Sequence, residues 1–104
     1  MPRFITPETL FSVLSSVVTI DVRKELAKAA SGMTITSAIL RNPYMVETWC
    51  RSLAGKRVVV FCVHGHEVSQ SVCRHLADQG VDASCLRGGF EAWVAEGYPV
   101  EPIR

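Results

Sequence analysis

The sequence lacks any long hydrophobic run and any strong excess of charge. Its longest uninterrupted apolar segment, Val58–Val63, has the length of a strand, whereas a membrane-spanning helix needs about 20 apolar residues. The 11 Lys and Arg residues nearly balance the 10 Asp and Glu residues, giving a formal net charge of +1. This balance argues against a protein that binds nucleic acid or a membrane through its overall charge.

The sequence also lacks the cysteine patterns typical of structural sites. No C-x-x-C pair occurs among its four cysteines, Cys50, Cys62, Cys73 and Cys85, which disfavours a zinc knuckle. The N-terminal residues do not resemble a secretory signal, so we expect a cytoplasmic protein with reduced thiols. Cys73 lies at helical spacing among apolar residues, and we expect it in the core.

No linker, repeat or low-complexity segment interrupts the 104 residues, so we expect one domain over residues 1–104. Apolar and β-branched runs predict strands at 4–5, 17–20, 57–62 and 81–86, with a weak one at 38–40. Capping residues and helical spacing predict helices from Pro7 behind an N-cap at Thr6, at 23–30, from Asn42 to Leu53, after the loop 63–69, and at 90–95. Strands that alternate with helices predict an α/β domain with a mainly parallel sheet.

Cys62 stands where the most apolar strand ends and a polar loop leads into a helix. Open α/β folds bind their ligands at this carboxyl edge of the sheet. The N–H groups of such a loop and the start of the helix favour the thiolate form of a cysteine. We therefore interpret Cys62 as a nucleophile; the alternative is a buried cysteine that merely ends the strand.

Several motifs, taken together in this order and spacing, resemble the rhodanese-like sulfurtransferase family: T-I-D-V-R (19–23), V-V-V-F-C-V-H-G (58–65), and L-R-G-G-F-E-A-W followed by G-Y-P-V (within 86–100). The resemblance implies a three-layer α/β domain whose central, mainly parallel sheet is flanked by helices. It also implies an enzyme that moves sulfane sulfur from thiosulfate or a persulfide to a thiol or cyanide acceptor. The sulfur would travel as a persulfide on Cys62, without a cofactor.

The resemblance assigns substrate binding to the loop after the nucleophile, which comprises Val63, His64, Gly65, His66, Glu67, Val68 and Ser69. Relatives usually carry Cys-x-x-Gly-x-Arg, and the Arg helps to bind the anionic donor; Glu67 takes its position here. A carboxylate opposes both a thiolate and an incoming anion. We therefore expect weak activity with thiosulfate and a preference for less charged persulfide donors.

Two other functions stay open. The missing Arg would suit a catalytically weak sensor or interaction module of the same fold. The segment from Cys62 to Gly80 looks one residue longer than in single-domain sulfurtransferases, a feature associated with phosphatase and arsenate-reductase relatives. The motif C-V-H-G-H-E-V-S (62–69), with R-N-P-Y-M-V-E-T-W (41–49), is similar to rhodanese-like domains associated with bacterial chromate-resistance proteins, which points to a bacterial origin.

The remaining candidate residues have competing interpretations. His64 and His66 could bind an oxyanion in place of the Arg; they could also join Cys62 around a metal, but alternating positions in a tight loop rarely aim at one centre, so no metal is expected. The resemblance places Asp21 and Arg23 at the edge of the catalytic pocket, the alternatives being a helix N-cap and a surface cation. An N-cap role alone would explain Ser69. The expected partners are a small sulfur donor and a thiol acceptor.

Overall fold

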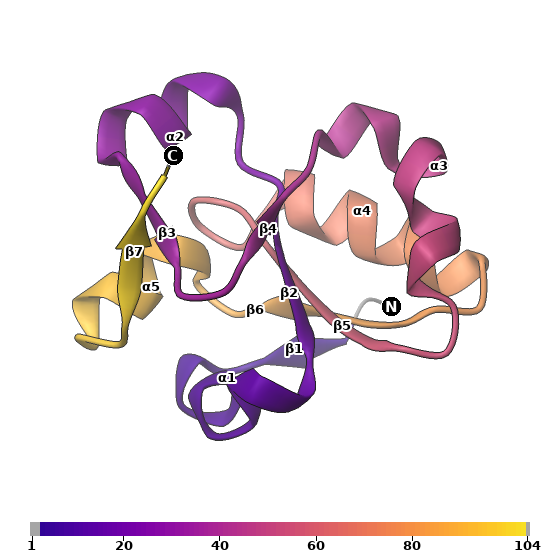
Figure 1. The fold of residues 1–104 in the computed structure, drawn as a ribbon, viewed down its shortest axis with the longest axis horizontal. Helices are drawn as coiled ribbons and strands as arrows, with labels where there is room; N and C mark the ends of the chain where they lie inside the picture. Colours follow the sequence, from indigo (N-terminus) through magenta and orange to yellow (C-terminus); the bar gives the residue numbers. More distant parts are fainter. Residues whose placement is uncertain (1–2, 104) are drawn as a thin grey trace.

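The computed structural model describes residues 3–103, whose main sheet has five parallel strands in the order β1-β6-β5-β2-β4 (Figure 1). These strands span Phe4–Ile5 (β1), Val18–Asp21 (β2), Ile39–Leu40 (β4), Arg57–Phe61 (β5) and Asp82–Leu86 (β6). A separate antiparallel pair joins β3 (Met33–Ile35) to β7 (Val100–Pro102). The predicted α/β class with a mainly parallel sheet is therefore confirmed.

The helices are short, and α4 is the longest of those in residues 3–103. They span Pro7–Val13 (α1), Glu25–Ser31 (α2), Val46–Trp49 (α3), Glu67–Asp78 (α4) and Gly89–Ala95 (α5), with 3-10 turns at Leu14–Ser16, Pro43–Met45 and Cys50–Leu53. Thr6 caps α1 as predicted, because its hydroxyl accepts the N–H of Thr9. Within the described range, no helix is both long and apolar enough to cross a membrane.

The central strand β5 shows how the sequence builds three layers. Its side chains alternate between the two faces of the sheet, as any strand requires. Val58 and Val60 join the core beneath α3 and α4, whereas Val59 and Phe61 join the core beneath α1 and α5. Because both faces are covered, the strand is apolar at successive positions. Its carboxyl end opens onto the loop that leads into α4 (Figure 1).

The structure differs from the sequence prediction mainly between β2 and α3. The segment 33–40 contains two strands instead of the single weak strand expected at 38–40. β3 was hidden because its partner β7 is far away in the sequence, with Met33 opposite Pro102, and β7 itself was not predicted. The helix expected at 23–30 begins at Glu25, because Arg23 turns inward before it.

Candidate active site

Cys62 follows β5 directly, and only 7% of the residue is exposed. It lines a pocket of about 250 Å³ between the loop of residues 63–66 and the start of α2. Arg23, Lys24 and Ala27 form the α2 side of this pocket. The two sides meet because β2 and β5 are neighbours in register, with Asp21 opposite Phe61. The predicted position of Cys62 at the carboxyl edge of the sheet is confirmed.

Ser69 lies closer to Cys62 than its predicted role required. The helix α4 begins at Glu67 with His66 at the N-cap position, so the prediction of Ser69 as N-cap is wrong. Ser69 is instead the third residue of the helix and is fully buried. Its Oγ atom lies 3.2 Å from Sγ of Cys62. The Ser69 hydroxyl can therefore donate a hydrogen bond to a Cys62 thiolate.

Two glycines hold the loop against the turn between β6 and α5. Gly65 has φ +75°, and a Cβ atom there would lie 2.8 Å from the carbonyl oxygen of Leu86. Gly89 has φ +64°, and its Cβ would lie 2.6 Å from the carbonyl oxygens of Cys62 and Val63. Both contacts are shorter than any side chain tolerates, so the loop and the turn need glycine. In the sequence, Gly89 stood out only as part of the motif L-R-G-G-F-E-A-W.

The loop leaves several of its backbone donors unused. The side-chain amide of Gln70 donates to the carbonyl oxygen of Gly65 at 3.0 Å, and the backbone N–H groups of Phe90 and Glu91 donate to the carbonyls of Cys62 and Val63. By contrast, no acceptor within residues 3–103 is hydrogen-bonded to the N–H groups of residues 63–68. Backbone N–H groups without an acceptor, in a loop that follows a buried cysteine, are able to bind a negatively charged group.

The charged side chains at the mouth of the pocket are mixed. Nδ1 of His64 lies 3.3 Å from a carboxylate oxygen of Glu91, and both side chains are more than half exposed. His66 lies beside His64, with 5.9 Å between the ring centroids. Exposed Glu67 and Lys24 line the pocket from opposite sides. Lys24 was missed by sequence analysis, because only the fold brings the start of α2 to this loop.

Val68 and Gly65 are the remaining residues of the loop. Val68 is half-buried and packs against the core beneath α3 and α4 while also lining the pocket. Gly65 is buried. Among the described residues, no three His, Cys, Asp or Glu side chains are grouped so that they could hold a metal ion.

Asp21 and Arg23 form a buried ion pair at the same edge of the sheet. Asp21 is 0% exposed and Arg23 2% exposed. Nε and one terminal nitrogen of Arg23 donate to the Asp21 carboxylate at 2.8–3.1 Å, and the backbone N–H of Arg23 donates to it at 3.0 Å. The two alternatives considered for these residues are therefore wrong: Lys24 occupies the N-cap position of α2, and Arg23 is not a surface cation.

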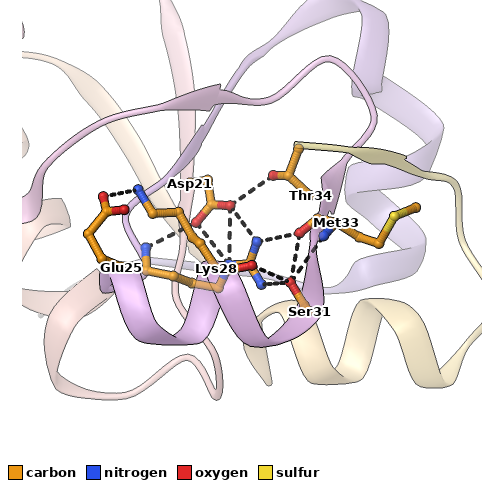
Figure 2. Close-up of polar contacts among 7 residues, drawn as sticks. Asp21, Glu25, Lys28, Ser31, Met33 and Thr34 are labelled. Carbon is orange, nitrogen blue, oxygen red and sulfur yellow. Dashed lines mark hydrogen bonds and ion pairs between the residues drawn. The ribbon is translucent and has the colours of Figure 1, made fainter. Parts of the chain in front are cut away.

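The ion pair extends into a wider hydrogen-bond network, shown in Figure 2. The hydroxyl of Thr34 donates to the Asp21 carboxylate at 2.8 Å, and Arg23 also donates to Ser31 Oγ and to the carbonyl oxygen of Met33. The guanidinium carbon lies 4.1 Å from the centroid of the Phe90 ring. This network connects β2, α2, β3 and α5. Within it, the Asp21 carboxylate neutralises the positive charge of Arg23.

The other cysteines are free thiols in the core, as Cys73 was predicted to be. Sγ of Cys85 lies 3.4 Å from the carbonyl oxygen of Ser69. A hydrogen bond with Cys73, together with burial, raises the pKa of Cys85 well above its ordinary value. Cys85 therefore stays a neutral thiol, whereas Cys62 is the cysteine that lines the pocket.

Comparison with known proteins agrees with this geometry. The chain is 51% identical over 41 residues to the thiosulfate sulfurtransferase GlpE of Coxiella burnetii, an alignment that covers 38% of this chain and 37% of that protein. A rhodanese-related protein from Thermoplasma volcanium superposes with a TM-score of 0.84 at 25% identity, over 95% of this chain and 97% of the other.

A thiosulfate sulfurtransferase from Pseudomonas aeruginosa also superposes with a TM-score of 0.84, over 98% of this chain and 20% of the larger one. At 23% identity, this likeness concerns the fold alone. A family model described as the rhodanese-like domain matches residues 12–96, which is most of the chain. The expected resemblance is thereby confirmed, and the chain belongs to the rhodanese-like domain family.

Proposed function

We propose that the protein is a sulfurtransferase that carries sulfane sulfur as a persulfide on Cys62. The observation that supports this most directly is the surroundings of the sulfur. Cys62 lines a pocket, faces the buried Ser69 hydroxyl and lies at the start of a loop whose N–H groups donate to no acceptor within residues 3–103. The N–H groups of such a loop can stabilise the negative charge on the terminal sulfur of a cysteine persulfide.

In the first half-reaction the Cys62 thiolate attacks the outer sulfur of the donor. The bond between Sγ and this outer sulfur forms while the sulfur–sulfur bond of the donor breaks, and the remainder of the donor leaves with the electron pair. With thiosulfate the leaving group is sulfite. The N–H groups of residues 63–68 surround the new terminal sulfur and stabilise its charge without having to reorganise.

In the second half-reaction an acceptor thiolate attacks the terminal sulfur of the persulfide. The Cys62 thiolate then leaves and accepts a hydrogen bond from Ser69. No step needs a cofactor: with a thiol acceptor each half-reaction exchanges one sulfur–sulfur bond for another, and with cyanide a carbon–sulfur bond forms as the sulfur–sulfur bond of the persulfide breaks. The acceptor is a thiol or cyanide, and the exposed mouth of the pocket gives it access.

The charges at the pocket favour donors with little charge of their own. Arg23 is neutralised by Asp21, and Glu67 places a carboxylate at the mouth. Among the described pocket residues, Lys24 is the cationic side chain that has no ion-pair partner. Thiosulfate, a dianion, is therefore attracted by Lys24 and repelled by Glu67. Both forces are weaker on a persulfide donor, because it carries less charge.

The experiment is mass spectrometry of the intact protein after treatment with thiosulfate or with a low-molecular-weight persulfide. Wild type is expected to gain the mass of one sulfur atom, which a thiol acceptor then removes. Cys62→Ser should gain none, and Cys50→Ser serves as the matched control that still loads. A wild-type protein without added sulfur would contradict the proposal.

A binding module without turnover is the second candidate, because Glu67 stands where the family usually has Arg. Steady-state assays separate the two, since a module would take up sulfur at most once per chain. An oxyanion hydrolase is less suited to the pocket, because Arg23 is the guanidinium that lines it and the Asp21 carboxylate already holds this group.

A further inference from the structure

A second, larger pocket begins where the pocket of Cys62 ends. It has a volume of about 560 Å³ and lies between α2 and α5, which Figure 1 shows at the same end of the molecule. We call it the α2–α5 groove. Small and apolar side chains form most of its wall: Ala27, Ala30, Val63, Phe90, Val94 and Ala95. Val94 is 48% exposed, so the groove is open to solvent.

The groove is continuous with the reactive sulfur. Arg23, Ala27 and Val63 line both pockets, and Val63 is the residue directly after Cys62. A molecule whose sulfur lies at Cys62 can therefore extend its remaining atoms across Val63 and into the α2–α5 groove, where they are sheltered from water.

The groove offers apolar contact and almost no free charge. Arg23 contributes to its wall, but the Asp21 carboxylate neutralises the guanidinium. Glu91 lies at the wall with its carboxylate toward His64. Among the described residues that line the groove, a phosphate or carboxylate would find no cationic side chain free of an ion-pair partner, whereas hydrocarbon would be removed from water.

We propose that the α2–α5 groove binds the apolar organic group of the sulfur donor, so that the protein acts on organic persulfides, R–S–SH, in which R is a hydrocarbon chain or ring. This inference rests on the proposed sulfurtransferase function and names the substrate class. The Cys62 thiolate attacks the terminal sulfur, the new sulfur–sulfur bond forms, and the thiolate RS⁻ leaves with the electron pair while R remains in the groove.

A series of alkanethiosulfonates, R–SO₂–S⁻, tests the substrate class. These probes share one charge and one reactive group, and they differ only in the length of R. Transfer to Cys62 releases the sulfinate R–SO₂⁻ with the electron pair. We expect kcat/KM to rise about threefold to fourfold for each methylene from methyl to butyl, the effect of burying one methylene group. A kcat/KM that does not change with chain length would overturn the inference.

Substitutions in the groove test whether the dependence of kcat/KM on chain length arises from the α2–α5 groove. Val94→Ser replaces an apolar wall residue by a polar one, and Ala30→Phe fills part of the space; both should flatten the increase with chain length. Leu26→Ser is the matched control, because Leu26 belongs to the same helix α2 and is 86% exposed but does not line the groove. It should leave the dependence intact. An equal loss in all three variants would contradict the assignment.

A binding measurement separates this inference from the proposed function. Alkanesulfonates, R–SO₃⁻, resemble the donors but carry no transferable sulfur, and their binding to Cys62→Ser is followed by calorimetry. Tighter binding of butanesulfonate than of methanesulfonate, lost in Val94→Ser, supports the groove even if no sulfur is transferred. Sulfur transfer with equal binding of both sulfonates would support the function and overturn the groove.

Discussion

The Asp21–Arg23 network and the loop after Cys62 lie at the same edge of the sheet, yet they treat polar groups in opposite ways. In the network, buried charges are paired and hydrogen-bonded to each other and to Thr34. In the loop, the N–H groups of residues 63–68 donate to no acceptor in the part of the chain that the structure describes. The network therefore has a structural role in the wall of the site, whereas the N–H groups of the loop remain able to bind a ligand.

Breaking the ion pair should produce the largest effect on stability. Asp21→Asn leaves the Arg23 guanidinium buried without a counter-charge, and removal of one partner of a buried pair costs about 3–5 kcal/mol of unfolding free energy. Asp82→Asn is the control, since its pair with Arg3 is more than half exposed on both sides and should contribute less than about 1 kcal/mol. Urea denaturation followed by circular dichroism measures both. Equal small losses would mean that the network is not structural.

Substitutions in the loop should act by changing its backbone conformation and not by breaking an ion pair. Gly65→Ala adds a Cβ atom 2.8 Å from the carbonyl oxygen of Leu86 and displaces the loop. Gly80→Ala is matched in backbone conformation, with φ +79° against +75°, but meets no neighbouring atom within 4 Å. Both variants share the strain of a left-handed residue, about 1–2 kcal/mol.

The two glycine variants should differ in catalysis. Gly65→Ala is expected to slow sulfur loading of Cys62 by about 100-fold, the scale of a displacement of about 1 Å at reacting groups. Gly80→Ala should load at the wild-type rate. Time-resolved mass spectrometry of the protein gives both rates, and similar rates for the two variants would show that loop shape is unimportant.

The charges at the mouth should have a moderate effect that depends on the donor. Glu67→Gln should raise kcat/KM for thiosulfate about fivefold and Lys24→Gln should lower it about fivefold, because a charge near the surface contributes about 1 kcal/mol at a few ångströms. Both changes should shrink at high salt and with persulfide donors. Glu96→Gln, which does not line the pocket, is the control. Identical shifts for both donors would contradict this assignment.

An effect of similar size, but independent of the donor, is expected at Ser69. Ser69→Ala removes the hydroxyl that lies 3.2 Å from Sγ of Cys62, and loss of one such hydrogen bond should slow alkylation of Cys62 by iodoacetamide about fivefold. Ser71→Ala changes an exposed serine of the same helix and should leave the rate unchanged. An unaltered rate in Ser69→Ala would show that the Ser69 hydroxyl does not affect the reactivity of Cys62.

Parts of this picture could be predicted from the sequence because they depend on local signals. The apolar run of β5 placed Cys62 at the carboxyl edge of a sheet, and the motifs around Asp21 and Cys62 indicated the family that the comparisons then showed. The start of α1 was equally local, since Thr6 and Pro7 are adjacent to the helix that they begin.

The rest depends on contacts between distant segments. Arg23 looks like a surface cation in sequence, and it is buried only because Asp21, Met33 and Phe90 surround it after folding. Lys24 enters the pocket because α2 lies beside the loop. Ser69 faces Cys62 because α4 begins three residues earlier than expected, at Glu67. Propensity and spacing along the chain contain none of this information.

The role of Cys62 as the carrier of the transferred sulfur can be tested by intact-protein mass spectrometry after incubation with a butyl persulfide. Wild type is expected to gain one sulfur, which peptide mapping locates on Cys62 and a thiol acceptor removes, and Cys62→Ser is expected to gain none. Sulfur on the Cys62→Ser variant at the wild-type level, or none on wild type, would contradict it.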